Sequence, residues 1–136
     1  MSRSSQPRSS PISHLPEPIR RVIGAAFDRQ AVDMVVLDLR RAHGFTDFFV
    51  ICSGSNPRQI RAIGDAIGTL LKGLGVRPNH VEGYERAEWI LIDCFDFIVH
   101  IFSPQTRAFY ALERLWGNAE RIEAVAPEAP ADTAQP

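Results

Sequence analysis

Apolar residues follow two different spacings along the chain, and these spacings predict the order of its helices and strands. Helical spacing after Pro16 and Pro18 predicts a first helix, and the same spacing after Asn56 and Pro57 predicts a second. Short runs rich in β-branched and aromatic residues are typical of strands. Five such runs occur, at residues 33–39, 47–53, 80–84, 89–93 and 97–102.

The stretch from Trp89 to Trp116 is the most informative part of the chain. Only residues 94–96 separate its two strand-like runs, and so short a connection predicts a β-hairpin. Ser103 suits the N-cap of a helix because its hydroxyl can accept from a free backbone N–H, and Pro104 suits the first helical position. We therefore expect a hairpin that feeds a third helix, which runs to Trp116 and folds back onto the sheet.

The order of these elements predicts the fold class. A helix, two strands, a helix, three strands and a final helix do not repeat a strand–helix unit, so a mixed sheet is expected. The prediction is an α/β (α+β) fold with a mixed five-stranded sheet flanked by three main helices. Residues 1–15 and 118–136 contain few large apolar groups, so we expect disordered tails around a single domain at residues 16–117.

Composition narrows the class of protein further. The chain has 136 residues, 45% of them hydrophobic, which is enough for one core. Its formal net charge of -1 lacks the overall basic character of a nucleic-acid binder, although a local basic patch remains compatible with it. Cys52 and Cys94 fit neither a disulfide framework nor a zinc site. We expect buried, reduced thiols in a cytoplasmic protein without a cofactor or a membrane span.

Four aspartates at strand ends, Asp38, Asp47, Asp93 and Asp96, are the candidate metal ligands. Two-metal phosphoryl-transfer sites need carboxylates that converge on one cation, and strand ends often supply them. Asp93 and Asp96, however, flank the hairpin turn, where aspartate side chains commonly bond nearby backbone N–H groups. Turn formation is the favoured interpretation, and no metal site is predicted.

The Gly/Ser turn that follows the second strand is a candidate anion site. Free N–H groups at a helix N-terminus favour negative charge, and Arg58 and Arg61 follow within the first turns. The turn lacks both the Walker spacing and a GxGxxG motif. Ordinary helix capping is therefore favoured over phosphate binding.

Aromatic residues around the hairpin form the candidate binding surface. Trp89 follows an acidic connection, and Tyr84 and Tyr110 are expected near it. Together with Cys94 they would form an apolar patch with polar rims, which is typical of protein contacts. The alternative that Trp89 and Tyr110 are core residues fits the pattern equally well. His100 alternates with Phe97, Val99 and Ile101, so we expect it on the other face of the strand, with Ile98 and Phe102, as a hydrogen-bonded, partly covered residue.

A series of separated motifs runs through the predicted domain. They are DFFVICSGS at residues 47–55, Arg58-Gln59, Glu82-Gly83, WILID at 89–93, VHIF at 99–102, Arg107, Phe109-Tyr110 and LERLW at 112–116. In this order they resemble the ribosomal silencing factor family, also called the Iojap family. The resemblance covers residues 19–117.

The resemblance implies a nucleotidyltransferase-like topology without the catalytic acids, and hence a protein that is not an enzyme. It implies a translational repressor that binds the large ribosomal subunit through the fourteenth protein of the large-subunit series and sterically blocks joining of the small subunit. A homodimer of the free protein is a further expectation. The family's binding surface corresponds to Trp89 and Cys94, and the full predicted partner-binding set is Trp89, Cys94, Asp96, Tyr84, His100 and Tyr110.

Phe95 departs from the family pattern. The hairpin turn of the family reads Asp-x-Gly-Asp, and Phe95 stands where the glycine is expected. A residue with a Cβ costs about 1 kcal/mol in a left-handed turn position, so another turn type is predicted here.

Two other functions stay open at this point. A nucleotidyltransferase-like enzyme would require the four strand-end aspartates to converge within reach of a metal ion. An RNA-binding module would require Arg58, Arg61 and Arg107 on one face, together with binding that weakens steeply with salt.

Overall fold

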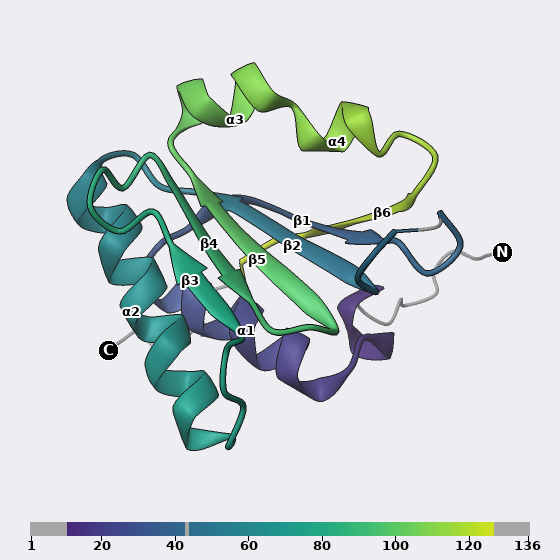
Figure 1. Cartoon of the computed structure of the whole chain (residues 1–136), viewed down its shortest axis with the longest axis horizontal. Helices are drawn as coiled ribbons and strands as arrows, with labels where there is room; N and C mark the ends of the chain where they lie inside the picture. The colour runs from purple at the N-terminus through teal and green to yellow at the C-terminus, as the bar shows by residue number, and fades with distance from the viewer. Residues whose placement is uncertain (1–10, 43, 127–136) are drawn as a thin grey trace, which may run out of the picture.

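The computed structural model describes residues 11–42 and 44–126, which contain a six-stranded sheet with helices on both faces (Figure 1). The strands are β1 Val32–Asp38, β2 Phe48–Ser53, β3 His80–Glu82, β4 Trp89–Asp93, β5 Phe97–Phe102 and β6 Glu120–Ala124. They lie side by side in the order β3-β4-β5-β2-β1-β6. Because β2 and β5 are parallel and every other neighbouring pair is antiparallel, the predicted mixed sheet is confirmed.

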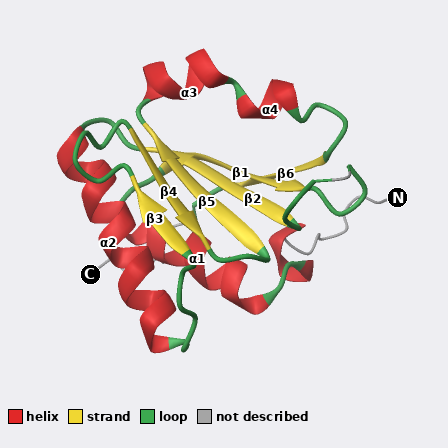
Figure 2. Cartoon of the chain, in the orientation of Figure 1, coloured by secondary structure: helices red, strands yellow, loops and turns green. Residues whose placement is uncertain are grey.

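The helices cover the two faces of the sheet unequally (Figure 2). They are the 3-10 helix η2 Pro11–His14 and the α-helices α1 Glu17–Asp28, α2 Pro57–Gly73, α3 Pro104–Tyr110 and α4 Leu112–Leu115. α1 and α2 pack on one face over the larger hydrophobic cluster, whereas α3 and α4 lie over the other face with a smaller cluster. No helix in the described chain is long and apolar enough to cross a membrane.

The predicted helix starts are confirmed in atomic detail. Asn56 Oδ1 accepts a hydrogen bond from the Gln59 N–H at 2.8 Å, and Pro57 is the first residue of α2. At the start of α3 the Ser103 hydroxyl accepts from the Thr106 N–H at 3.2 Å. Each cap satisfies an N–H group that a helix leaves free. Ordinary capping therefore accounts for the turn before α2.

Alternation along β5 assigns its side chains to the two faces. Phe97, Val99 and Ile101 belong to the larger cluster beneath α1 and α2, and Phe102 belongs to the smaller one. His100 shares the face of Phe102, with the two rings stacked at a centroid distance of 6.0 Å. The predicted orientation of His100 is confirmed, and it lies on the side of the sheet that α3 and α4 cover. It is buried, with 3% of its surface exposed, rather than partly covered as expected.

The segment after Gly117 is not the disordered tail that was expected from residue 118. β6 pairs antiparallel with β1 and places Ile122 opposite Val36, which corrects the predicted five strands to six. Only Ile122 and Ala124 of this strand pack against the core, so its apolar signal is weak. Backbone pairing to a neighbour forms an edge strand even where its side chains are charged.

The expected N-terminal tail also ends earlier than predicted. Residues 1–10 lie outside the described chain. Leu15 is only 6% exposed, and Ile12 packs against the larger cluster. The folded domain therefore begins before residue 16, because these two apolar side chains cover the end of the core.

The single helix expected between Ser103 and Trp116 is divided in two. Ala111 adopts the left-handed conformation, with φ 47° and ψ 55°, and its N–H closes α3 on the Arg107 carbonyl at 2.8 Å. α4 then buries Leu112, whereas no residue of α3 is buried. The break lets Leu112 join the smaller cluster while α3 remains a surface helix.

Candidate functional site

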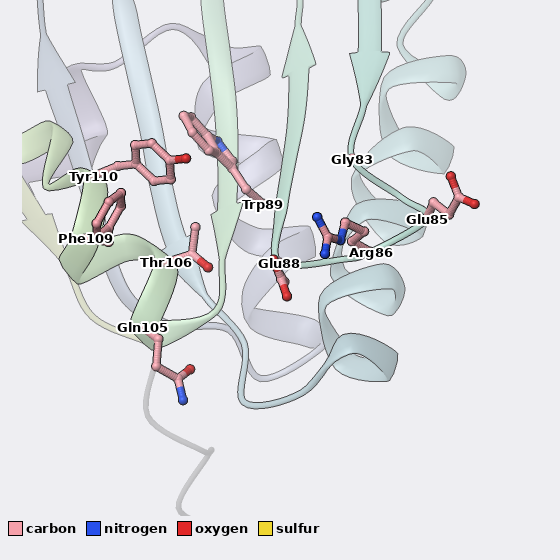
Figure 3. A pocket seen from close by; sticks show the side chains of 9 residues that line it. All are labelled: Gly83, Glu85, Arg86, Glu88, Trp89, Gln105, Thr106, Phe109 and Tyr110. Atoms are coloured by element: carbon pink, nitrogen blue, oxygen red, sulfur yellow. The ribbon is translucent and has the colours of Figure 1, made fainter.

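A hollow of about 690 Å³ opens between α3 and the loop that joins β3 to β4 (Figure 3). Loop residues 83–88 form one wall and α3 forms the other, with the start of β4 between them. The lining residues are Gly83, Glu85, Arg86, Glu88, Trp89, Gln105, Thr106, Phe109 and Tyr110. Three aromatic rings are thus combined with charged and polar groups at the rim.

Trp89 is partly buried and touches other rings on several sides. Its ring centroid lies 4.7 Å from Tyr110, 4.9 Å from Phe102 and 5.9 Å from His100. Figure 3 shows the Trp89 side chain and the Tyr110 ring projecting toward one another at the upper end of the hollow. Trp89 therefore packs on the smaller hydrophobic cluster and also reaches the surface. The two interpretations offered for it, core residue and binding-surface residue, each describe part of its environment.

His100 holds the Trp89 side chain by a hydrogen bond on its buried side. The Trp89 indole Nε1–H donates a hydrogen bond to His100 Nδ1 at 3.1 Å. Burial lowers the pKa of His100 to about 3, so its ring is neutral near pH 7. A neutral imidazole that accepts at Nδ1 carries its proton on Nε2. That Nε2 atom is buried without a hydrogen-bond partner among the described residues.

The loop wall of the hollow is fastened to α2. Arg61 donates from Nε to the Tyr84 carbonyl at 2.9 Å and from Nη2 to the Glu85 carbonyl at 2.7 Å. The Tyr84 hydroxyl lies so close to Gly64 that a Cβ there would collide with it. Gly83 has φ +98°, and a Cβ at this position would collide with the Trp89 carbonyl. Arg61 and two glycines therefore determine where the loop lies.

The structure brings together three of the six predicted partner-binding residues. Trp89, His100 and Tyr110 are in mutual or shared contact on the α3 side of the sheet. Tyr84 instead packs on α2 against the larger cluster, and burial, followed by Asp65, raises its pKa to about 12.

The remaining two residues of that set, Cys94 and Asp96, lie at the hairpin end of β4, away from the hollow. Five residues of extended chain, about 16 Å, separate Cys94 from Trp89. Cys94 also belongs to the cluster beneath α1 and α2, because positions 90, 92 and 94 face the opposite way from 89. Burial, followed by Asp93, raises the pKa of its thiol to about 11. The single patch expected around Trp89 and Cys94 is therefore not formed.

Sequence reasoning missed several exposed apolar residues on the same face as Trp89. Phe109 is 80% exposed and lines the hollow, and Leu115 on α4 is 71% exposed. Phe45 is 76% exposed and makes an edge contact with Phe49 at 6.1 Å. Phe109 stands within the segment that was expected to form the third helix, but the sequence gave no sign that the whole of α3 stays unburied. Of these, Phe109 lies beside Trp89 and Tyr110 in the hollow, and exposed apolar carbon gathered in one place is typical of a contact surface.

The hairpin turn confirms the structural interpretation of Asp93. Its Oδ1 accepts from the Phe95 N–H at 2.9 Å. Phe95 has φ +70°, so the left-handed conformation is kept although glycine is absent, and the predicted change of turn type is wrong. Asp38 is bound by Arg40 at 2.8 Å, and this hydrogen bond lowers the Asp38 pKa. Across residues 11–42 and 44–126, no three His, Cys, Asp or Glu side chains are placed to hold a metal ion.

The three arginines of the RNA-binding alternative do not form one face. Arg107 is on α3, where it binds Glu113 at 2.7 Å and the Ser53 hydroxyl at 2.9 Å, with its side chain 12% exposed. Arg58 and Arg61 are on α2, which covers the opposite face of the sheet. Because Arg61 and Arg107 are occupied by internal partners, a shared phosphate-binding surface is not assembled.

These features define a small α+β domain with a surface hollow that combines three aromatic rings with charged and polar groups. The model of the family "Ribosomal silencing factor during starvation" matches residues 12–136. The chain belongs to this family, which also supports a role in ribosome silencing.

Individual relatives agree with this assignment. "Ribosomal silencing factor RsfS" of Halalkalibacterium halodurans is 36% identical over 107 residues, covering 79% of this chain and 92% of that protein. The mouse protein "Mitochondrial assembly of ribosomal large subunit protein 1" is 32% identical over 110 residues, 69% of this chain and 47% of that one. The solved structure of protein CV0518 from Chromobacterium violaceum is 29% identical, covers 87% of this chain and 97% of its own, and has a TM-score of 0.72.

Proposed function

We propose that this chain is a translational repressor that binds the large ribosomal subunit and sterically blocks joining of the small subunit. The observation that carries the proposal is the partly open aromatic hollow around Trp89, in a member of the silencing factor family. A protein held on the joining surface of one subunit excludes the other subunit by occupying space. Such a mechanism needs a contact surface and no catalytic group.

The partner in this proposal is the fourteenth protein of the large-subunit series. The name of the mouse relative refers to the large ribosomal subunit, which supports a partner there. Trp89, Phe109 and Tyr110 supply the central contact, since aromatic anchors surrounded by a polar rim contribute most of the binding energy in many interfaces. Asp96 supplies a second contact at the hairpin end of β4, and Cys94, which is 8% exposed, packs beneath the turn in the larger cluster.

His100 and Tyr84 act behind the surface in this proposal. His100 bonds the Trp89 indole from within, and Tyr84 fixes the loop wall against α2. In this proposal the sheet has a nucleotidyltransferase-like topology, and the protein uses it for binding rather than for catalysis. We place the protein in the cytoplasm, where it meets free subunits, and we include a homodimer as a state of the unbound protein.

Co-sedimentation with separated ribosomal subunits tests the proposal. We expect the protein to pellet with purified large subunits and to stay in the supernatant with small subunits. Binding that persists as salt is raised indicates an apolar protein contact, whereas a steep loss with salt indicates contact with RNA phosphates. Equal pelleting with both subunits, or a steep salt dependence, would contradict the proposal.

A further inference from the structure

The indole N–H of Trp89 is turned into the protein although the ring itself reaches the surface. Trp89 is the first residue of β4. His100 lies on β5 and is paired with Leu91 of β4. The bond from Nε1 to Nδ1, 3.1 Å long, therefore runs diagonally between neighbouring strands on one face of the sheet. Nε1 is the only polar atom of a tryptophan side chain, and it is a donor alone.

The acceptor is held in place by its own neighbours. The His100 ring is 3% exposed. It stacks on Phe102 with 7° between the ring planes, and Phe49 meets it edge-on with centroids 4.5 Å apart. Because the imidazole is buried between these rings, the core fixes the position of Nδ1.

We propose that His100 is a positioning residue that holds the Trp89 indole in one orientation, with its N–H inward and its carbon edge and face presented to the partner. The inference rests on the proposed function for its second half, because it describes what a partner meets at Trp89. Tyr110, 4.7 Å away, limits the ring from the other side. The partner surface that covers Trp89 is accordingly aliphatic or aromatic carbon, and it offers no acceptor to the indole N–H.

The hydrogen bond can be observed directly by NMR on the full chain. The chain has two tryptophans, so ¹⁵N-labelled protein gives two indole N–H resonances, which Trp116→Phe assigns. In His100→Phe, which keeps a stacked ring and removes the acceptor, we expect the Trp89 resonance to move upfield and its exchange with solvent to accelerate. The Trp116 resonance is the internal reference and should stay in place.

A conservative variant separates positioning from mere packing. In His100→Asn the amide oxygen can occupy the place of Nδ1, so it should restore a protected Trp89 N–H even though the smaller side chain packs less well. An unchanged Trp89 resonance in His100→Phe would overturn the inference. So would a Trp89 resonance that responds equally to both variants.

Binding to purified large subunits provides the second readout. A side chain that must be ordered on binding costs a factor of roughly two to ten in affinity. We expect this loss in folded His100→Phe, where Trp89 is no longer held, and a partial recovery in His100→Asn. A shifted resonance with unchanged affinity would overturn the positioning role. If the wild-type protein fails to bind subunits, the proposed function is refuted, while the NMR comparison still decides the orientation of the indole.

Discussion

Replacement of Trp89 by alanine should lower both the stability of the protein and its affinity for the large subunit. The ring is partly buried, and an aromatic side chain in such a place removes on the order of 100 Å² from water, worth about 2.5 kcal/mol at roughly 25 cal/mol per Å². The change also leaves His100 Nδ1 without its donor, which adds about 1 kcal/mol. We therefore expect the free energy of unfolding to fall by about 3.5 kcal/mol.

The loss of binding should come from the exposed part of the same ring. A central aromatic anchor contributes roughly 2 kcal/mol or more to an interface, so its removal should raise the dissociation constant about thirtyfold. A domain with ordinary stability of about 5–15 kcal/mol stays mostly folded after this mutation, so its affinity remains measurable. Chemical denaturation and co-sedimentation with large subunits, performed on the same preparation, give the two quantities separately.

Phe109→Ala is the matched control for Trp89→Ala. Phe109 lines the same hollow but is 80% exposed, so its removal should change stability by less than about 0.5 kcal/mol while still weakening binding. Folded Trp89→Ala that binds as tightly as the wild type would refute the anchor role. A Trp89→Ala protein as stable as the wild type would refute the packing described for this ring.

Three further predictions concern the surroundings of the site. Phe95→Gly should raise the free energy of unfolding by about 0.5–1 kcal/mol in chemical denaturation, because φ +70° is strained for phenylalanine and glycine relieves the strain at some entropic cost; a destabilised variant would contradict this. Arg61→Ala should lower the free energy of unfolding by about 1 kcal/mol and speed amide hydrogen exchange in the loop before Trp89, because it removes two hydrogen bonds to that loop. Arg58→Ala should have neither effect, and equal behaviour of the two variants would show that Arg61 does not hold the loop. Deletion of residues 118–136 should lower the melting temperature markedly because it removes β6, whereas deletion of 127–136 should not; equal melting temperatures would show that β6 contributes little.

Local physical signals explain why most of the fold could be predicted from the sequence. Asn56 and Ser103 act as N-caps through contacts with residues three positions away, and these are visible in the sequence itself. The alternation along β5 likewise follows from the geometry of a strand, so the face of His100 could be predicted. β6 was missed because backbone pairing with β1 determines it, and its charged side chains carry little of that information.

The candidate site was less predictable because distant contacts build it. Arg61 holds a loop more than twenty residues away, through backbone carbonyls that any sequence provides. The left-handed break at Ala111 leaves α3 on the surface, and an alanine gives no sign of such a conformation. Strand alternation does, by contrast, separate Cys94 from Trp89, because side chains an odd number of positions apart along an extended segment point to opposite faces.

Light scattering with purified large and small subunits measures whether the protein blocks subunit joining. Large subunits are first mixed with the protein or with Trp89→Ala, at concentrations where co-sedimentation shows the wild-type protein bound. The expected result is that the wild-type protein suppresses the rise in scattering when small subunits are added, and that Trp89→Ala suppresses it only at much higher concentration. A normal rise in scattering from large subunits that carry the wild-type protein would contradict it.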